Sequence, residues 1–390
     1  MFKTKKLLLG ILLLVLLLPL WLWIFWLITP KRKMVVAIVD KTVLTDKAQE
    51  HTSLDWLLNN NKFSKTAEKL YHPDHDYFGF FPKKDFQYDL KGLERYSRDQ
   101  LDQLSSDVNL TYFTDTYGIY KNEWYSSAQN TERSGIVYGG MSKQDVEFLE
   151  LMKNKHKLIL AEFNTIGSPT NNLIRNKFEN LFHMRWTGWT ARYFPVLDTV
   201  KDKELPQWLV NNYKKEHHGK WPFHNAGVAF VSSSDRVVII EEGEGAHDAM
   251  TYIVSRDKGR KQLNLPEKIK YPFWFDIIIP DTTINTVAAN FKIQTTAKGR
   301  DELKRNGIPL RIPAVIYHKS SDYQFYYFSG DFCDNPISMF SSYFKGVGTF
   351  SGLFYNSDNK EDRSDFFWQF YRPMLNRILN DHYKSIQSKE

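Results

Sequence analysis

The hydrophobic pattern of the chain starts with a long uncharged segment. Residues 7–29 contain no charged side chain and lie between basic residues on both sides. A run of this length is sufficient to span a bilayer, and it is longer than the apolar core of a cleaved signal peptide. Trp21, Trp23 and Trp26 near its end are typical of a membrane interface. The sequence therefore predicts an uncleaved transmembrane anchor over residues 1–33, a single-pass protein in the cell membrane, and a C-terminal domain on the extracytoplasmic side.

Beyond this segment, residues 34–245 alternate short apolar runs with amphipathic segments. The apolar runs show no regular polar alternation, which is typical of strands buried on both faces of a parallel sheet. Ser142 and Asp145 form a capping-box pattern at the start of one predicted helix. The expected fold class is therefore α/β, with a mainly parallel sheet and helices on both faces. Its clearest predicted strands are Met34–Asp40, Leu110–Asp115 and Leu158–Glu162.

Residues 246–390 have a different character, with longer aromatic strands. Segments 313–319 and 323–332 predict an antiparallel pair around a polar turn. The last predicted helix contains Pro373, and a proline inside a helical pattern predicts a kink or break near Arg372. We therefore expect a C-terminal α+β region that packs on the α/β domain.

The amino-acid composition narrows the classes of function. Most of the 28 Phe, 21 Tyr and 11 Trp side chains are expected in the core, and the remainder can line a groove where ring faces stack on sugars or bases. The formal charge of +7 is spread along the chain without a long basic stripe. This distribution argues against nucleic-acid binding and suits a membrane surface or a wall polymer. A single cysteine, Cys333, leaves no internal disulfide.

Acidic residues end three of the predicted strands. Because the carboxyl ends of parallel strands meet at one edge of a sheet, where α/β proteins bind ligands, we expect these acids at one site. Carboxylates accept hydrogen bonds from sugar hydroxyls, so acids beside aromatic side chains favour carbohydrate. Glu162 is the candidate catalytic residue, facing a cleft, since paired carboxylates can hydrolyse glycosides. The alternative is that the acids cap helices or pair with Lys and Arg. The expected ligand-binding residues are Asp115, Tyr117, Asn164, Arg192, Tyr193 and Glu241.

One strand–helix–strand segment resembles a known superfamily. The turn Gly139–Gly140, the helix after it and the strand ending at Glu162 resemble the class I glutamine amidotransferase-like proteins, which have a flavodoxin-like fold. The resemblance covers about residues 34–245. It implies that Gly139 and Gly140 help to form an oxyanion hole, and so belong to the ligand-binding residues, and that Phe163 lies closest to the position of the nucleophilic cysteine. No cysteine stands there, and the partner His and Glu have no clear match. These departures argue against thiol-dependent activity and leave a pseudoenzyme or a carboxylate-based hydrolase.

Two further polar segments contain residue types that can bind a metal ion. Residues 329–336 hold Asp331, Asp334 and Asn335, which fit a ligand loop or a weak cation site, or else an Asx-rich turn before proline. Residues 71–76 hold two His and two Asp but lack a helical or strand frame, and a surface loop is expected there. No phosphate-loop, dinucleotide or zinc-finger motif occurs in the sequence. The sequence therefore predicts neither a cofactor nor a metal.

Two hypotheses of function follow from these patterns. The first is a membrane-anchored, extracytoplasmic protein of cell-envelope or exopolysaccharide metabolism, which binds or processes carbohydrate at the C-terminal edge of its sheet. The second is a non-catalytic scaffold subunit of a membrane glycosyltransferase or export complex. The expected partners are accordingly the cell membrane, a carbohydrate or wall polymer, and such a complex. A deep pocket lined by Asp115, Glu162 and Arg192 favours the first hypothesis, and a flat apolar patch favours the second.

Overall fold

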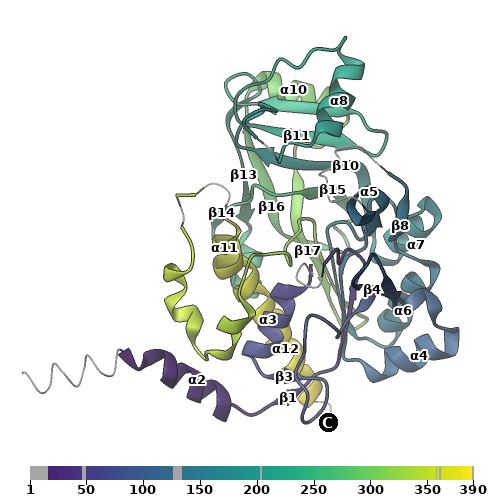
Figure 1. Cartoon of the computed structure of the whole chain (residues 1–390), viewed down its shortest axis with the longest axis vertical. Helices are drawn as coiled ribbons and strands as arrows, with labels where there is room; N and C mark the ends of the chain where they lie inside the picture. The colour runs from purple at the N-terminus through teal and green to yellow at the C-terminus, as the bar shows by residue number, and fades with distance from the viewer. Residues whose placement is uncertain are drawn as a thin grey trace, which may run out of the picture.

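Two sheets organise the protein. The computed structural model describes residues 16–45, 50–125, 134–202, 204–356, 358–359 and 362–388. A large sheet forms the centre of the molecule, and a smaller sheet lies beside α8 and α10 at one end, the top of the view in Figure 1. The candidate ligand site lies in the region between these two sheets.

The large sheet has ten strands and mixed directions. The neighbours from β18 through β9, β6 and β2 to β4 are parallel, and the other neighbours are antiparallel. In spatial order its strands are β14 (Lys268–Lys270), β13 (Ala246–Ser255), β16 (Thr286–Thr295), β17 (Ile312–Lys319), β18 (Gln324–Phe328), β9 (Leu158–Glu162), β6 (Leu110–Asp115), β2 (Val36–Asp40), β4 (Phe78–Pro82) and β5 (Tyr88–Leu90).

The prediction of a mainly parallel sheet was therefore wrong. The strands of the C-terminal region extend the sheet by antiparallel pairing as far as β18, which then lies parallel to β9. A run buried on both faces has the same apolar pattern in either direction, because direction depends on whether a hairpin or a crossover connects the strands. The predicted regions 34–245 and 246–390 thus share one sheet.

The smaller sheet is antiparallel and also draws on both regions. β10 lies between β11 and β15, so that a strand from the C-terminal region completes it. Its strands in order are β12 (Val237–Glu241), β11 (Gly227–Ser232), β10 (Met184–Phe194) and β15 (Phe275–Pro280). Two short ribbons pair β1 (Arg32–Lys33) with β3 (Phe63–Ser64) and β7 (Ile119–Tyr120) with β8 (Ile136–Tyr138).

Helices cover both faces of the large sheet. Side chains alternate between the two faces along each strand, so each strand contributes apolar side chains to the helices on both sides. Ile159 and Ala161 of β9 pack with α6 and α7, whereas Leu158 and Leu160 belong to the cluster that contains α3 and α12. The capping box of Ser142 is confirmed at the start of α6. The helices are α3 (Thr52–Asn60), α4 (Arg98–Asp107), α5 (Lys121–Tyr125), α6 (Lys143–Asn154), α7 (Asn172–Phe182), α8 (Gln207–Glu216), α9 (Asp257–Leu263), α10 (Ala297–Arg305), α11 (Arg363–Phe366) and α12 (Arg372–Gln387).

The predicted strand–helix–strand unit differs in its first strand. β8, which leads into the Gly139–Gly140 turn, pairs with β7 outside the large sheet. The parallel neighbours of β9 are β6 and β18 instead. Near Arg372, where a kink or break was predicted, the backbone stays helical, but a π-helical turn over Phe367–Tyr371 interrupts the α-helical pattern between α11 and α12.

The prediction of an N-terminal transmembrane anchor is contradicted. The described helix in this region is α2 (Leu18–Ile28). Within the described part of the chain, no helix is long and apolar enough to cross a membrane. α2 has 11 residues, about 16 Å of helix against the roughly 30 Å of a bilayer core. The predicted transmembrane helix, signal anchor and single-pass, extracytoplasmic placement are therefore not supported. Residues 1–15 lie outside the described residues.

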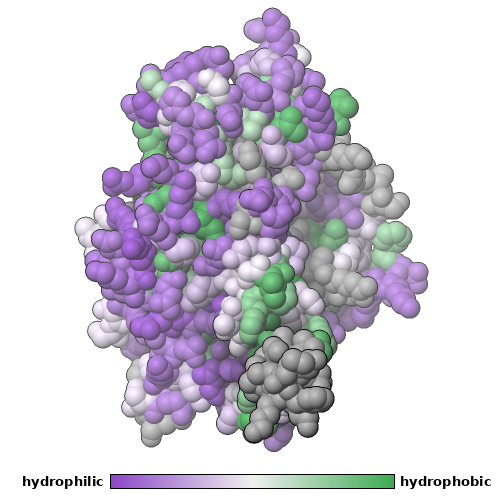
Figure 2. Space-filling model, turned by 90° about the vertical axis from the view of Figure 1, so that its left-hand side faces the viewer, coloured by the Kyte–Doolittle hydropathy of each residue, from purple (hydrophilic) through white to green (hydrophobic). Residues whose placement is uncertain are grey.

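The three tryptophans of α2 also differ in exposure, unlike the side chains of a membrane-interface belt. Trp26 is buried, its Nε1 donates to the carbonyl of Asn59 at 3.0 Å, and the Lys62 ammonium lies 3.2 Å from its ring centre. Trp21 and Trp23 are exposed. α2 lies at the lower left of the view in Figure 1, whereas the visible face in Figure 2 is mainly hydrophilic with some apolar side chains in its lower half.

Candidate functional site

The carboxyl ends of β2 and β6 form the switch point of the parallel strands. The chain runs from β2 to β4 on one side and then returns to β6 on the other side. Ligands of open α/β sheets bind outside the carboxyl ends of strands at such a point. Asp40 ends β2 and Asp115 ends β6, and the two residues are partners in the strand register. The sequence therefore placed Asp115 correctly at the edge where a site is expected.

Asp115 is a buried acceptor of three hydrogen bonds. Its Oδ1 accepts from the Thr42 hydroxyl and from the Tyr117 N–H, both at 2.5 Å, and its Oδ2 accepts from the Asn164 amide at 3.0 Å. Burial raises the pKa of Asp115 to about 8, although the hydrogen bonds from Thr42 and Asn164 act in the opposite direction. The carboxyl is 6% exposed. Asp115 is thus a positioning residue that holds Tyr117 and Asn164.

Asn164 occupies the sharp turn after β9. Its φ of 64° lies in the left-handed region, which is uncommon for a residue other than glycine and costs conformational energy. Its amide is held by Asp115 and can offer hydrogen bonds, but it is not a nucleophile. The turn that resembles a cysteine-bearing elbow therefore presents an amide, next to the largely buried Phe163.

The Gly139–Gly140 turn lies against the same edge. A Cβ on Gly139 would come within 2.6 Å of both the Tyr117 carbonyl oxygen and the Gly118 Cα, so glycine permits this close approach. The Gly140 N–H donates to the Thr116 carbonyl at 2.6 Å. Because this N–H is already engaged, it does not point freely toward an oxyanion. The two glycines therefore shape the edge beside Tyr117.

Glu162 lies in the core, not in the cleft where it was expected. It is 1% exposed, and its carboxylate oxygens accept from the Tyr112 hydroxyl at 2.5 Å and the Cys333 N–H at 3.0 Å. The Tyr371 hydroxyl donates to the sulfur of Cys333 at 3.1 Å, which extends the network. Burial, with the nearby Asp331 charge, raises the pKa of Glu162 well above its usual value. This environment favours the protonated form of the carboxyl, and the hydrogen bonds join β6, β9 and the loop after β18.

A pocket opens beside Asn164 where the two sheets meet. We call it the aromatic pocket; its volume is about 340 Å³. It combines the turns after β6 and β9 with side chains of β10, β11 and the start of α8. The residues that give it its chemical character are Tyr117, Phe163, Asn164, Trp186, Trp208 and Trp274.

Contacts hold the aromatic pocket in shape. The Arg175 guanidinium lies 4.6 Å from the ring centre of Trp186 and donates to the carbonyls of Ile166 and Thr170. The Trp186 Nε1 donates to the Trp189 carbonyl at 2.9 Å. The turn after β9 and the indole of Trp186 are therefore fixed by one side chain, Arg175.

A second, smaller pocket adjoins the first at Trp274. We call it the acidic pocket; its volume is about 210 Å³. Arg192 and Tyr193 line it, and Arg192 forms an ion pair with Glu204 rather than with Glu162. Its remaining polar lining residues are Asp331 and Arg363.

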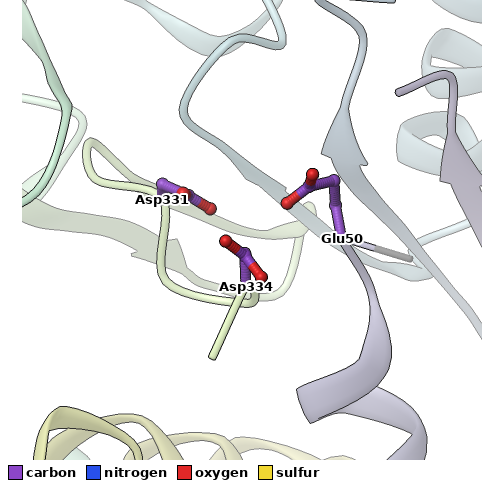
Figure 3. A group of neighbouring side chains, drawn as sticks. All are labelled: Glu50, Asp331 and Asp334. Atoms are coloured by element: carbon purple, nitrogen blue, oxygen red, sulfur yellow. The ribbon is translucent and has the colours of Figure 1, made fainter. Parts of the chain in front are cut away.

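Three carboxylates gather beside the acidic pocket, and one of them, Asp331, lines it. Figure 3 shows Glu50, which precedes α3, and Asp331 and Asp334, from the loop after β18, directing their oxygens toward one another. One oxygen of each lies within 4.8 Å of the others, an arrangement that could hold a hard cation such as Ca²⁺ or Mg²⁺. Arg363 already pairs with Asp331 at 3.1 Å and with Asp334 at 2.5 Å. The cluster alone therefore does not identify a metal.

The pKa values of this cluster reflect burial first and the charges of neighbouring groups second. Burial, followed by the charges of Asp334 and Asp331, raises the pKa of Glu50 well above its usual value. Burial raises the pKa of Asp331 to about 6, against the lowering effect of Arg363. Two of the three carboxyls therefore bind protons more tightly than exposed acids do.

The structure thus brings together only part of the predicted site. Asp115, Tyr117, Asn164 and the two glycines meet at one edge, whereas Arg192 and Tyr193 line the adjoining acidic pocket. Glu241 accepts from the N–H groups of His224 and Asn225 at the end of β12 and lines neither pocket.

The sequence analysis did not predict most of the aromatic side chains that line the aromatic pocket. On β10, Trp186 lines the pocket, whereas Trp189 is buried. Strand alternation from Arg192 through Thr190 reaches Trp186, which lines the aromatic pocket together with Thr190, so this alternation is the signal that could have identified it. Glu50 and Arg363 carried no local signal, because their partners lie far away in the sequence.

Comparison with known proteins gives few relations. No family model matches this chain, and no curated protein matches it. A ThuA-like protein from Parabacteroides merdae ATCC 43184 is 11% identical, with 77% of this chain and 79% of that chain covered and a TM-score of 0.34. A ThuA-like protein from Bacteroides uniformis ATCC 8492 is 10% identical, with 78% and 83% covered and a TM-score of 0.31.

A β-galactosidase from Bacillus circulans sp. alkalophilus is 11% identical, with 58% of this chain covered and a TM-score of 0.27. This chain spans 21% of the length of that enzyme. We draw no conclusion about activity from likenesses at these TM-scores.

Proposed function

We propose that this protein binds carbohydrate in the aromatic pocket. The observation that carries the proposal is the grouping of three half-buried indoles, those of Trp186, Trp208 and Trp274, with the amide of Asn164. Indole faces stack on the apolar faces of sugar rings, while a few placed polar groups fix the orientation of a ligand. The volume of about 340 Å³ lies in the range of small-molecule sites.

The uncharged lining of the aromatic pocket supports a neutral ligand. Among the described residues that line the aromatic pocket, none carries a charged side chain. Hydroxyl and amide groups are supplied by Tyr117, Asn164, Thr190 and Ser232. A ligand with many hydroxyls and no charge satisfies both the rings and these groups.

The proposal is binding, without a catalytic step. Glu162, the predicted catalytic acid, is buried and already hydrogen-bonded. The concave shape of the aromatic pocket supports a ligand site over the flat apolar patch expected of a scaffold. Participation in a glycosyltransferase complex stays a prediction.

This proposal can be tested by applying the purified full-length protein to a glycan array. We expect retention of neutral oligosaccharides by the wild-type protein, and about a tenfold or larger loss of affinity in Trp274→Ala, because a stacking surface is removed. Trp23→Ala on α2 removes an exposed indole far from the pocket and is the matched control. A wild-type protein that retains no glycan, or a Trp274→Ala variant with unchanged affinity, contradicts the proposal.

A further inference from the structure

The aromatic pocket continues at both of its ends. Trp274 lines both the aromatic and the acidic pocket. Trp208 lines both the aromatic pocket and a third, open depression of about 750 Å³ along α8, which we call the outer groove. The aromatic pocket therefore has a concave neighbour on each side, and one indole lines both members of each pair. The outer groove is lined by Trp208, Asn211, Asn212, Lys214, Lys215, Gly219 and Asp235.

The dimensions of this path exceed a single ring. β10 places Trp186 in the aromatic pocket and Arg192 in the acidic pocket. The bulge between Trp186 and Thr190 shortens the strand, so that the two positions lie as far apart as about four residues of the neighbouring strand β15, or about 13 Å. On α8, Trp208, Asn211, Asn212 and Lys215 follow a spacing of three and four residues and share one helix face, which adds about 10 Å.

The chemistry along the path suits a repeating ligand. An indole stands at each junction between regions, and amide groups lie on both sides of Trp208, from Asn164 in the aromatic pocket and from Asn211 and Asn212 in the outer groove. Each indole can support a ring face, whatever substituents the ring carries, while amides contact hydroxyls between rings.

We infer that the ligand is an extended oligosaccharide of several units rather than a single sugar, with its chain running from the acidic pocket through the aromatic pocket into the outer groove. This inference rests on the proposed function, since it concerns the length of the ligand at the same site. Asn211 and Asn212 are assigned as contacts for the distal units, because both project from the α8 face that lines the outer groove.

Isothermal titration with cello-, chito- and manno-oligosaccharides of one to six units tests the inference on the full chain. We expect the affinity of the wild-type protein to rise with length beyond the units that fill the aromatic pocket. The double variant Asn211→Ala/Asn212→Ala is expected to lose about tenfold in affinity for the longest ligands, the effect of one or two hydrogen bonds. Its affinity for the shortest bound ligand is expected to stay unchanged.

The controls separate the two proposals. Lys177→Ala, a substitution on α7 at a residue that lines none of the three regions, should bind every length as the wild type does. Affinity that does not increase with length, or a double variant that weakens all lengths equally, overturns the extended ligand and leaves the proposed function standing. Absence of binding at every length overturns both. Circular dichroism and melting of the double variant verify that α8 remains folded.

Discussion

The side-chain amide of Asn164 donates a hydrogen bond of 3.0 Å to the buried carboxylate of Asp115. This contact ties the turn after β9 to the end of β6, at the edge where the parallel strands reverse their order. The same carboxylate also accepts from the backbone of Tyr117, so that one acid holds two residues that line the aromatic pocket. The shape of the pocket therefore depends on a residue that barely reaches its surface.

Replacement of Asp115 is expected to reduce ligand affinity and to change the pH dependence of stability. The pKa of about 8 lies above the usual value near 4, so the folded state binds a proton more tightly than the unfolded state between these pH values. The free energy of unfolding should therefore fall as the pH rises from about 4 to about 8. Asp115→Asn should reduce this slope in urea unfolding measured at several pH values.

Other buried acids with raised pKa values contribute in the same direction, so a reduced slope is expected rather than a flat profile. Burial raises the pKa of Asp276 to about 7, with the same sign. Asp55→Asn provides the matched control, because burial also raises the pKa of this α3 residue to about 7 and it lines none of the pockets: it should also reduce the slope, but with less effect on ligand affinity. An unchanged slope in Asp115→Asn contradicts the assignment of a raised pKa to this carboxyl.

Substitutions of Glu162 distinguish a core residue from a catalytic one. Glu162→Gln preserves the shape and keeps one oxygen to accept from the Cys333 N–H, while the Tyr112 hydroxyl can turn to accept from the new amide N–H. Since burial raises the pKa of Glu162 well above its usual value, little change in melting temperature or glycan affinity is expected from removing its charge. Glu162→Ala leaves the Tyr112 hydroxyl and the Cys333 N–H without their acceptor and creates a cavity, at a cost of about 2–4 kcal/mol. A Glu162→Gln variant that folds normally but has lost ligand binding would restore a direct role at the site.

Arg175 offers a test of how the pocket is held. Arg175→Lys keeps the positive charge but loses the planar group that lies over Trp186 and reaches two carbonyls. We expect a loss of about 1–2 kcal/mol in stability together with a several-fold weaker glycan affinity. The fluorescence of the indoles should respond less to added ligand. The same substitution at Arg305, which is paired only on the surface with Glu302, should leave affinity unchanged.

The carboxylate cluster depends on Arg363. Arg363→Gln leaves Glu50, Asp331 and Asp334 without their nearby cation, and about 1–3 kcal/mol of stability should be lost near neutral pH. The loss should be smaller below pH 6, because burial raises the pKa of Asp331 to about 6 and its protonation relieves the repulsion. Adding Asp334→Asn to the variant should recover part of the loss in thermal unfolding. A loss that grows as the pH falls would contradict this account.

The sequence by itself determined the local elements whose pattern needs no distant partner. Leu110–Asp115 and Leu158–Glu162 are strands with the predicted bounds, since each is a continuous apolar run between polar turns. The capping box of Ser142 and the π-helical turn before Arg372 also follow from short-range hydrogen bonding and proline geometry. The grouping of Asp115, Tyr117 and Asn164 followed from the rule that parallel strand ends share an edge.

Only the tertiary structure decided strand direction, burial of the acids and the composition of the pockets. The sheet is mixed because the C-terminal strands join it by antiparallel pairing, and a doubly buried strand has the same pattern in either direction. Glu162 is buried because the loop around Cys333, far away in the sequence, closes over it. The aromatic pocket joins Asn164 to Trp208 and Trp274 through the packing of the small sheet on the large one. Such contacts depend on long-range pairing, which no local pattern encodes.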